Sequence, residues 1–209
     1  MNNLFPPSEF DDWAAGYDRD ALDEHGFPFD GYSTVLRTIV QLTAPRPQGS
    51  ILDLGIGTGN LALLFSEKGC HVWGLDFSIE MLKLAQVKLP DANLALNDLR
   101  AALPPEFPRL YDYIVSAYTF HHFPLEEKVD LIRFLMENHL RPNCSIVIGD
   151  IAFQDAAAEG DLRRRFGGEW EQEYYWLADE SLSALTAAGI SAIYTQVSSC
   201  AGVFQLTKI

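Results

Sequence analysis

The chain has 209 residues, of which 48% are hydrophobic and 21% charged, as in an ordinary folded domain and unlike a disordered chain. Its formal net charge of −14 disfavours nucleic acids and anionic membrane surfaces as partners. Three scattered cysteines, the lack of a basic leader and the lack of an apolar run of about 20 residues favour a cytoplasmic protein that contains free thiols.

We expect the first 44 residues to be helical. Phe10, Trp13, Ala14 and Tyr17 recur at spacings of three and four, which places them on one face of a helix. The run P-R-P-Q-G at residues 45–49 then breaks the chain.

From Ser50 onward, short apolar runs alternate with helical patterns. This alternation favours right-handed crossovers, and hence a parallel sheet with helices on both faces. The last two β-rich runs are joined by only five residues, which favours an antiparallel hairpin. The expected strands are residues 50–54, 71–75, 92–96, 111–117, 145–149, 191–197 and 203–208, and the expected helices between them are residues 60–68, 79–89, 125–139 and 179–188.

The pattern predicts a single α/β domain with a mostly parallel sheet of seven strands. Residues 50–150 would form the ligand-binding core, and residues 179–209 the last helix and the hairpin. The segment 151–178 breaks the alternation and follows a strand's carboxyl end, where open α/β sheets bind ligands. We expect this segment and the helical residues 1–44 to form a lid.

The most informative segment is I-L-D-L-G-I-G-T-G-N at residues 51–60. A buried strand leads into Gly55, Gly57 and Gly59, where the backbone can turn sharply and approach a ligand without a Cβ clash. The dinucleotide fingerprint requires G-x-G-x-x-G, whereas this spacing is G-x-G-x-G. Asp53, two positions before the first glycine, would repel a pyrophosphate and attract an ammonium group.

Two further acids stand at the ends of predicted strands. Asp76 ends the second strand, and its two carboxylate oxygens can accept both hydroxyls of a ribose. Asp98 follows the third strand, where it can accept a hydrogen bond from an adenine amino group. Either acid alone can be a strand-end cap, but three acids beside one glycine loop indicate a binding site.

At these residues the chain resembles the class I, Rossmann-like, S-adenosylmethionine-dependent methyltransferases. D-L-G-I-G-T-G-N, G-L-D-F-S, N-D-L and Y-D-Y-I-V-S look like motifs I to IV of that family, and the resemblance covers residues 10–208. F-x-x-W-A-x-x-Y-D at residues 10–18, with Y-T-F-H-H-F at residues 118–123, looks like a small, poorly characterised bacterial group within it. The fourth-strand motif lacks an N-P-P-Y-type sequence, which argues against methylation of DNA or of an amide nitrogen.

The resemblance implies a binding mode for S-adenosylmethionine. Asp53 and the backbone of Gly55, Gly57 and Gly59 would face the methionine part, and Asp76 would hold the ribose diol. The product would be S-adenosylhomocysteine, and a small molecule would accept the methyl group.

The adenine would lie against residues that follow the second and third strands. Phe77 or Met81 would pack on the ring, while Asp98 and the backbone of Leu99 would read its edge.

Methyl transfer from a sulfonium is an in-line displacement, so a base is needed only where the acceptor must lose a proton. His121 and His122 follow the fourth strand and are candidate bases, because histidine titrates near neutral pH. The sequence does not choose between them, and both can instead pack in the loop. Tyr17 is a third candidate, from the N-terminal helix.

Two other functions stay open. A protein that binds the cofactor and transfers nothing would be a regulator. A nicotinamide-dependent oxidoreductase is disfavoured by Asp53 and by Asn60. We therefore predict a methyltransferase that acts on a small molecule and has no metal site, and leave the accepting atom and the oligomeric state open.

Overall fold

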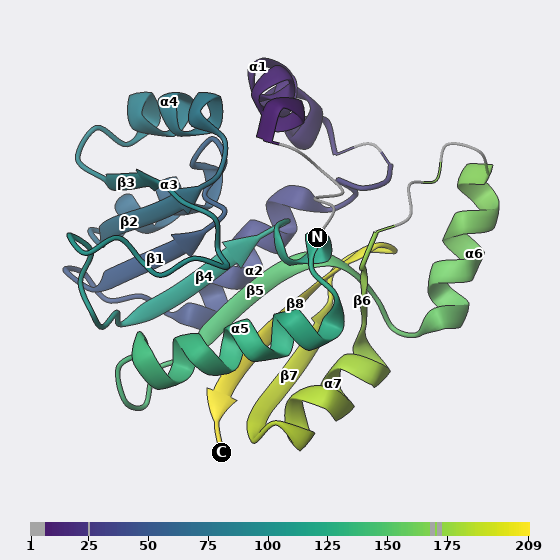
Figure 1. Ribbon diagram of the computed structural model, residues 1–209. Coiled ribbons are helices and arrows are strands. Elements are labelled where there is room, and N and C mark those ends of the chain that lie inside the picture. Colours follow the sequence, from purple (N-terminus) through teal and green to yellow (C-terminus); the bar gives the residue numbers. More distant parts are fainter. Residues whose placement is uncertain (1–6, 25, 168–169, 171–172) are drawn as a thin grey trace.

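The computed structural model describes residues 7–24, 26–167, 170 and 173–209. A twisted eight-stranded sheet lies at the centre, with helices on both faces (Figure 1). The strands are β1 (Ser50–Leu54), β2 (His71–Asp76), β3 (Asn93–Leu96), β4 (Tyr113–Ala117), β5 (Ile146–Phe153), β6 (Trp176–Leu177), β7 (Ile190–Gln196) and β8 (Ala201–Lys208).

The strand order is β3-β2-β1-β4-β5-β8-β7, and the two-residue strand β6 pairs with β5 beside this path. Strands β1 to β5 pair in parallel, because each crossover returns the chain to the same edge of the sheet. β8 is antiparallel to both β5 and β7. The predicted mostly parallel sheet and the antiparallel hairpin at its end are thus confirmed.

β5 is longer than predicted. The apolar run S-I-V-I-G stops at an acid, but the strand continues through Asp150 to Phe153. The Asp150 side chain is fully buried and accepts a hydrogen bond from Trp176 Nε1 at 3.1 Å. A buried acid that has partners does not end a strand, so the segment outside the core begins only after Phe153.

The helices divide between two apolar layers. α2, α3 and α4 pack on one face of the sheet, and α5 and α7 pack on the other, in front of the sheet in Figure 1. No helix within the described ranges is long and apolar enough to cross a membrane. The helices are α1 (Pro7–Asp23), α2 (Tyr32–Thr43), α3 (Asn60–Ser66), α4 (Ile79–Lys88), α5 (Leu125–Asn138), α6 (Ala156–Phe166) and α7 (Ala178–Ala187), with a 3₁₀ turn η1 (Phe120–His122).

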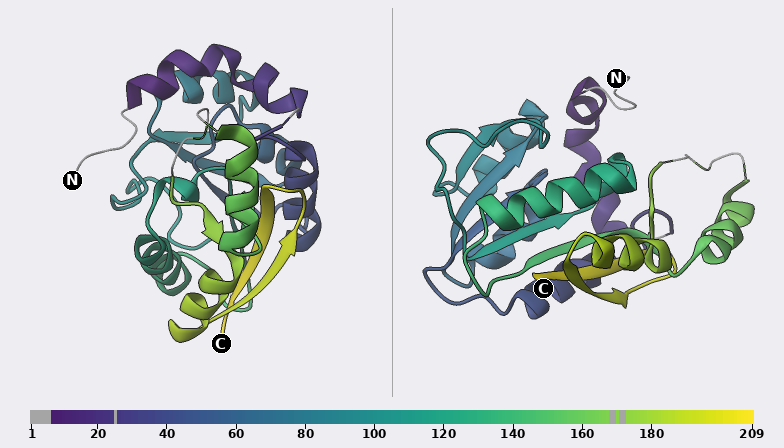
Figure 2. Two further views of the ribbon diagram at one scale, coloured as in Figure 1. Left: turned by 90° about the vertical axis from the view of Figure 1, so that its right-hand side faces the viewer. Right: turned by 60° about the horizontal axis from the view of Figure 1, so that its bottom comes forward.

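Two helices lie outside these layers. α1 crosses the carboxyl edge of the sheet beside α4, and α6 stands away from the body beyond the end of β5 (Figure 2). Both occupy the side at which the parallel strands end, which is where open α/β sheets bind ligands.

One glycine of β5 tests how tightly α2 packs on the sheet. A Cβ at Gly149 would lie 2.4 Å from Val35 Cγ1 and 2.8 Å from Ile39 Cδ1. We expect Gly149→Ala to lower the free energy of unfolding in urea by about 1–3 kcal/mol, because the core would be overpacked. Gly160→Ala on α6 is the control, since its Cβ meets only the end of Arg164 at 3.4 Å. It should raise the same free energy by roughly 0.5–1 kcal/mol.

Candidate active site

The loop between β1 and α3 has the predicted sharp turn. Gly55, Gly57 and Gly59 all have positive φ, at 70°, 54° and 88°, which glycine adopts without strain. A Cβ at Gly55 would lie 2.2 Å from Thr119 Oγ1, whereas a Cβ at Gly57 would have nothing within 4 Å. The middle glycine therefore faces open space that a ligand can enter.

Asp76 holds this loop in place. Its Oδ2 accepts a hydrogen bond from the Gly57 N–H at 2.8 Å, and its Oδ1 accepts one from the Ser78 N–H at 2.9 Å. Burial raises the pKa of Asp76 to about 6, although these N–H donors act in the opposite direction. Each oxygen keeps a second lone pair, so the carboxylate can still accept ligand hydroxyls.

Asp53 lies under the loop with an unsatisfied oxygen. Its side chain is 1% exposed, and its Oδ2 is buried with no hydrogen-bond partner among the described residues. Burial and the neighbouring Asp76 raise the pKa of Asp53 to about 8. A buried acid without a donor is costly, and a cationic ligand group at this point would satisfy it.

The residues predicted around an adenine ring are spread over different environments. Phe77 has its ring 4.8 Å from that of Phe10 on α1, while Met81 is 2% exposed and belongs to the core. The Asp98 side chain is 45% exposed, and both its oxygens accept hydrogen bonds from the Arg100 guanidinium. This pairing lowers the pKa of Asp98. Leu99 is half-buried against the α5 layer.

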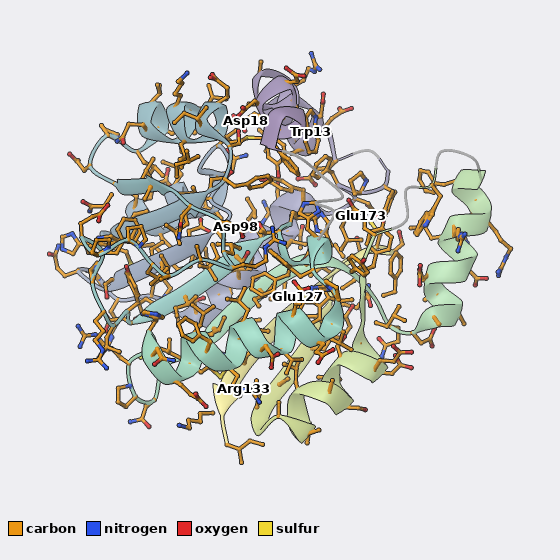
Figure 3. All side chains as sticks on the ribbon, viewed as in Figure 1. Trp13, Asp18, Asp98, Glu127, Arg133 and Glu173 are labelled. Atoms are coloured by element: carbon orange, nitrogen blue, oxygen red, sulfur yellow. The ribbon has the colours of Figure 1, made fainter. Side chains whose placement is uncertain are left out.

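The attachment of α1 to the glycine loop was not predicted from the sequence. Asp18 Oδ1 accepts hydrogen bonds from Thr58 Oγ1 at 2.5 Å and from Asn60 Nδ2 at 3.0 Å. Its Oδ2 pairs with Lys88 Nζ at 2.5 Å, and Figure 3 shows Asp18 between α1 and α4. These contacts lower the pKa of Asp18, although burial acts against them.

A second acid of α1 binds the beginning of α4. Asp11 Oδ1 accepts hydrogen bonds from Ser78 Oγ at 2.5 Å and from the Glu80 N–H at 3.3 Å. Asp11 and Asp18 are seven residues apart and so share a helix face, which is the signal that could have found them.

A cavity of about 530 Å³ lies beneath α1. It is lined mainly by aromatic rings, and no lysine or arginine is among its described lining residues. It receives residues both from the N-terminal segment and from the segment after β5. The lining consists of Phe10, Trp13, Tyr17, Phe27, Pro28, Phe29, Tyr118, His121, His122, Ile151, Phe166, Glu173 and Tyr175.

Both predicted histidines line this cavity, and Glu173 joins them there. His121 Nε2 lies 3.5 Å from Glu173 Oε2, and His122 Nδ1 lies 3.7 Å from Glu173 Oε1. On its other side, His121 Nδ1 lies 2.6 Å from Asp150 Oδ1. The sequence did not indicate Asp150 or Glu173, because neither stands near the histidines along the chain.

The two histidines differ in electrostatics. Burial acts to lower the pKa of His121, but the adjacent Asp150 carboxylate outweighs it and the pKa is raised. Burial and the proximity of His121 lower the pKa of His122 to about 2, which favours a neutral imidazole near neutral pH.

Tyr17, the third candidate, also lines the cavity. Burial, with a smaller contribution from Tyr32, raises its pKa well above the ordinary value. Its hydroxyl therefore stays protonated at neutral pH and can act as a hydrogen-bond donor.

The chain is similar to proteins described as methyltransferases. A family model described as "Methyltransferase domain" matches residues 51–143. "Uncharacterized methyltransferase GK2543" of Geobacillus kaustophilus (strain HTA426) is 32% identical over 212 residues, which covers 95% of each chain. "Uncharacterized methyltransferase YrrT" of Bacillus subtilis (strain 168) is 32% identical over 210 residues, with 95% of this chain and 96% of that protein covered.

Solved structures share the fold at lower identity. A DhpI–SAH complex has a TM-score of 0.73 at 19% identity, covering 97% of this chain and 94% of that chain. Magnesium protoporphyrin IX methyltransferase (ChlM) of Synechocystis PCC 6803 with bound SAH has a TM-score of 0.66 at 18% identity, covering 97% and 99%.

The buried carboxyl of Asp53 predicts an effect on stability. Since its folded-state pKa of about 8 lies above the ordinary 3.8, ionising it opposes folding increasingly as the pH rises between these values. We expect Asp53→Asn to stabilise the ligand-free protein by roughly 2 kcal/mol at pH 8 and much less at pH 4. Urea unfolding at both pH values measures the difference. The exposed Asp91→Asn is the control, and equal effects of the two variants at pH 8 would contradict the assignment.

Proposed function

The chain belongs to the class I S-adenosylmethionine-dependent methyltransferases, and from this premise we propose that it methylates a small molecule bound in the aromatic cavity under α1. The observation that carries the proposal is the pair of buried acids at the glycine loop. Asp53 has an unpaired buried oxygen, and Asp76 fixes a loop whose middle glycine faces open space. These groups match the ammonium and the ribose diol of S-adenosylmethionine in charge and in hydrogen-bonding capacity.

The cofactor supplies an activated methyl group on a sulfonium. Asp53 and the backbone of Gly55, Gly57 and Gly59 would bind its methionine part, and Asp76 its ribose. The adenine would lie against Phe77, with Met81 supporting the pocket from the core. Asp98 and the Leu99 backbone would meet the adenine edge, provided that Asp98 binds through the lone pairs that Arg100 leaves free.

The acceptor would lie in the cavity of about 530 Å³, a volume that suits a small molecule better than a polymer. Its apolar body would pack among the aromatic rings, and its reacting atom would lie at the polar end formed by His121, His122 and Glu173. Because no lysine or arginine is among the described lining residues, an uncharged or cationic acceptor fits better than an anionic one.

Two segments would act as a lid over this cavity. Phe10 and Trp13 come from α1, while Phe166 and Tyr175 come from the chain after β5. Figure 3 shows Trp13 on α1 above Glu173. Exclusion of water by such a lid would favour transfer to the acceptor over side reactions.

Calorimetric titration with S-adenosylhomocysteine tests the cofactor site. We expect a 1:1 isotherm, and an affinity roughly 100-fold lower in Asp76→Ala, which removes two hydrogen bonds to the ribose. A thermal melt of the variant shows whether it is folded, and Asp91→Ala is the surface control. If the protein binds NADH and not S-adenosylhomocysteine, the proposal is wrong and a nicotinamide-dependent activity replaces it.

The role of α1 is tested by Asp18→Ala. The variant loses the hydrogen bonds to Thr58 and Asn60 and the ion pair with Lys88, so closure of α1 should become less favourable by about 1–2 kcal/mol. We expect S-adenosylhomocysteine to bind roughly 10-fold more weakly, and amide exchange in α1 to become faster. Asp20→Ala on the same helix removes only contacts within α1 and should leave both measurements unchanged.

A further inference from the structure

The polar end of the cavity has the composition of a metal site. It presents two imidazole nitrogens and one carboxylate, and the candidate ligand atoms of His121, His122 and Glu173 all lie within 4.8 Å of one another. Two histidines and one glutamate are a donor set that catalytic zinc sites use. Imidazole donors select Zn²⁺ and similar transition-metal ions over Mg²⁺ and Ca²⁺.

The distances suit a shared ion. Ligand atoms bonded at about 2.1 Å to one tetrahedral Zn²⁺ lie roughly 3.4 Å apart. His121 Nε2 and Glu173 Oε2 are 3.5 Å apart, and His122 Nδ1 and Glu173 Oε1 are 3.7 Å apart. Both separations are therefore close to the one expected for two ligands of a single ion.

A buried partner already orients one of the ligands. Asp150 is fully buried, and its Oδ1 lies 2.6 Å from His121 Nδ1. Trp176 Nε1 and the Ile151 N–H hold this carboxylate by hydrogen bonds of 3.1 and 2.8 Å. A carboxylate behind a histidine keeps the proton on Nδ1 and presents the Nε2 lone pair, which is the usual arrangement behind metal-bound histidines.

The cluster also lies where an ion could take part in methyl transfer. Its three side chains line the acceptor cavity, so an ion bound to them keeps coordination positions open toward the acceptor. The ring of Phe10 lies 5.4 Å from that of His122 and 4.8 Å from that of Phe77 at the proposed cofactor pocket. The ring of Phe10 therefore contacts both halves of the proposed site.

We propose that His121, His122 and Glu173 bind a divalent transition-metal ion, best matched by Zn²⁺, at the polar end of the cavity. This inference rests on the proposed function, because an ion bound there would have its open coordination positions toward the methyl acceptor.

The proposal revises our expectation that the chain has no metal site. That expectation rested on local spacing, whereas Glu173 stands some fifty residues after the histidines and joins them only through the fold.

The test uses the full chain, stripped of metal by a chelator. A Co²⁺ titration, monitored through the visible ligand-field bands of the ion, should show one binding site per chain. Calorimetric titration with Zn²⁺ should give the same stoichiometry. We expect Glu173→Gln and His122→Asn each to weaken Zn²⁺ binding at least 10-fold. Asp150→Asn should weaken it 10–100-fold although all three ligands remain. Thermal melts show which variants are folded, and Mg²⁺ should bind far more weakly.

Other histidines could bind metal adventitiously, so the double variant of the exposed His71 and the half-buried His139, His71→Ala/His139→Ala, is the matched control and should keep the site. The proposal is overturned if no 1:1 binding occurs, if Mg²⁺ binds equally well, or if this control abolishes binding while folded Glu173→Gln does not affect it. The first result would leave an ion pair between His121 and Glu173 as the explanation of the cluster, and the last two would leave adventitious metal.

S-adenosylhomocysteine titrations on the same metal-free samples separate the two proposals. Binding of this product in the absence of metal, together with no Zn²⁺ site, would reject only the metal inference. Loss of its binding in every sample would reject the proposed function.

Discussion

The Asp76 carboxylate, 6% exposed and held by two backbone N–H groups, joins three parts of the molecule that are distant along the chain. It fixes the glycine loop through Gly57 and the beginning of α4 through Ser78. The Ser78 hydroxyl accepts a hydrogen bond from the Met81 N–H as the helix cap, and donates one to Asp11 of α1. A substitution of Asp76 therefore affects the glycine loop, the beginning of α4 and the attachment of α1 together.

The polar end of the cavity depends on a different constraint, which is that a buried charge must be paired. Asp150 is fully buried within β5 and is satisfied by His121, Trp176 and the backbone of Ile151. Nearby, the buried Lys128 donates to the Tyr174 carbonyl and lies 4.3 Å from the Trp176 ring centroid. Burial lowers its pKa to about 8. The position of the polar cluster in the cavity is thus determined by the core beneath it.

Sequence patterns predicted the features that are local. The sheet follows from apolar runs of strand length, and the turn at residues 55–59 follows from its glycines, because backbone conformation depends mainly on neighbouring residues. Sequence patterns did not predict the contacts that join residues distant along the chain. Asp18 and Lys88 are 70 positions apart, and His121 and Asp150 are 29 apart. No pattern along the chain shows that such side chains meet.

The roles of individual residues were also not predicted, in the case of Asp98 because a local partner was overlooked. Asp98 is an acid at a strand end in the sequence, but its nearest strong partner, Arg100, stands only two residues away and pairs with both its oxygens. The low pKa of His122 is another example, since it results from burial beside His121, and burial depends on the packed fold. The sequence therefore favoured neither histidine, whereas the structure gives them different properties.

The attachment of α1 has a consequence for the timing of turnover. Asp11 and Asp18 bind to opposite ends of α4 and its neighbouring loop, so the helix cannot release one end and keep a half-open position at low cost. The whole helix would move away from α4 in one step and would uncover the proposed cofactor pocket and the aromatic cavity together. The residence time of a bound product would then be set by the motion of this helix, and two molecules of quite different intrinsic affinity would leave at similar rates.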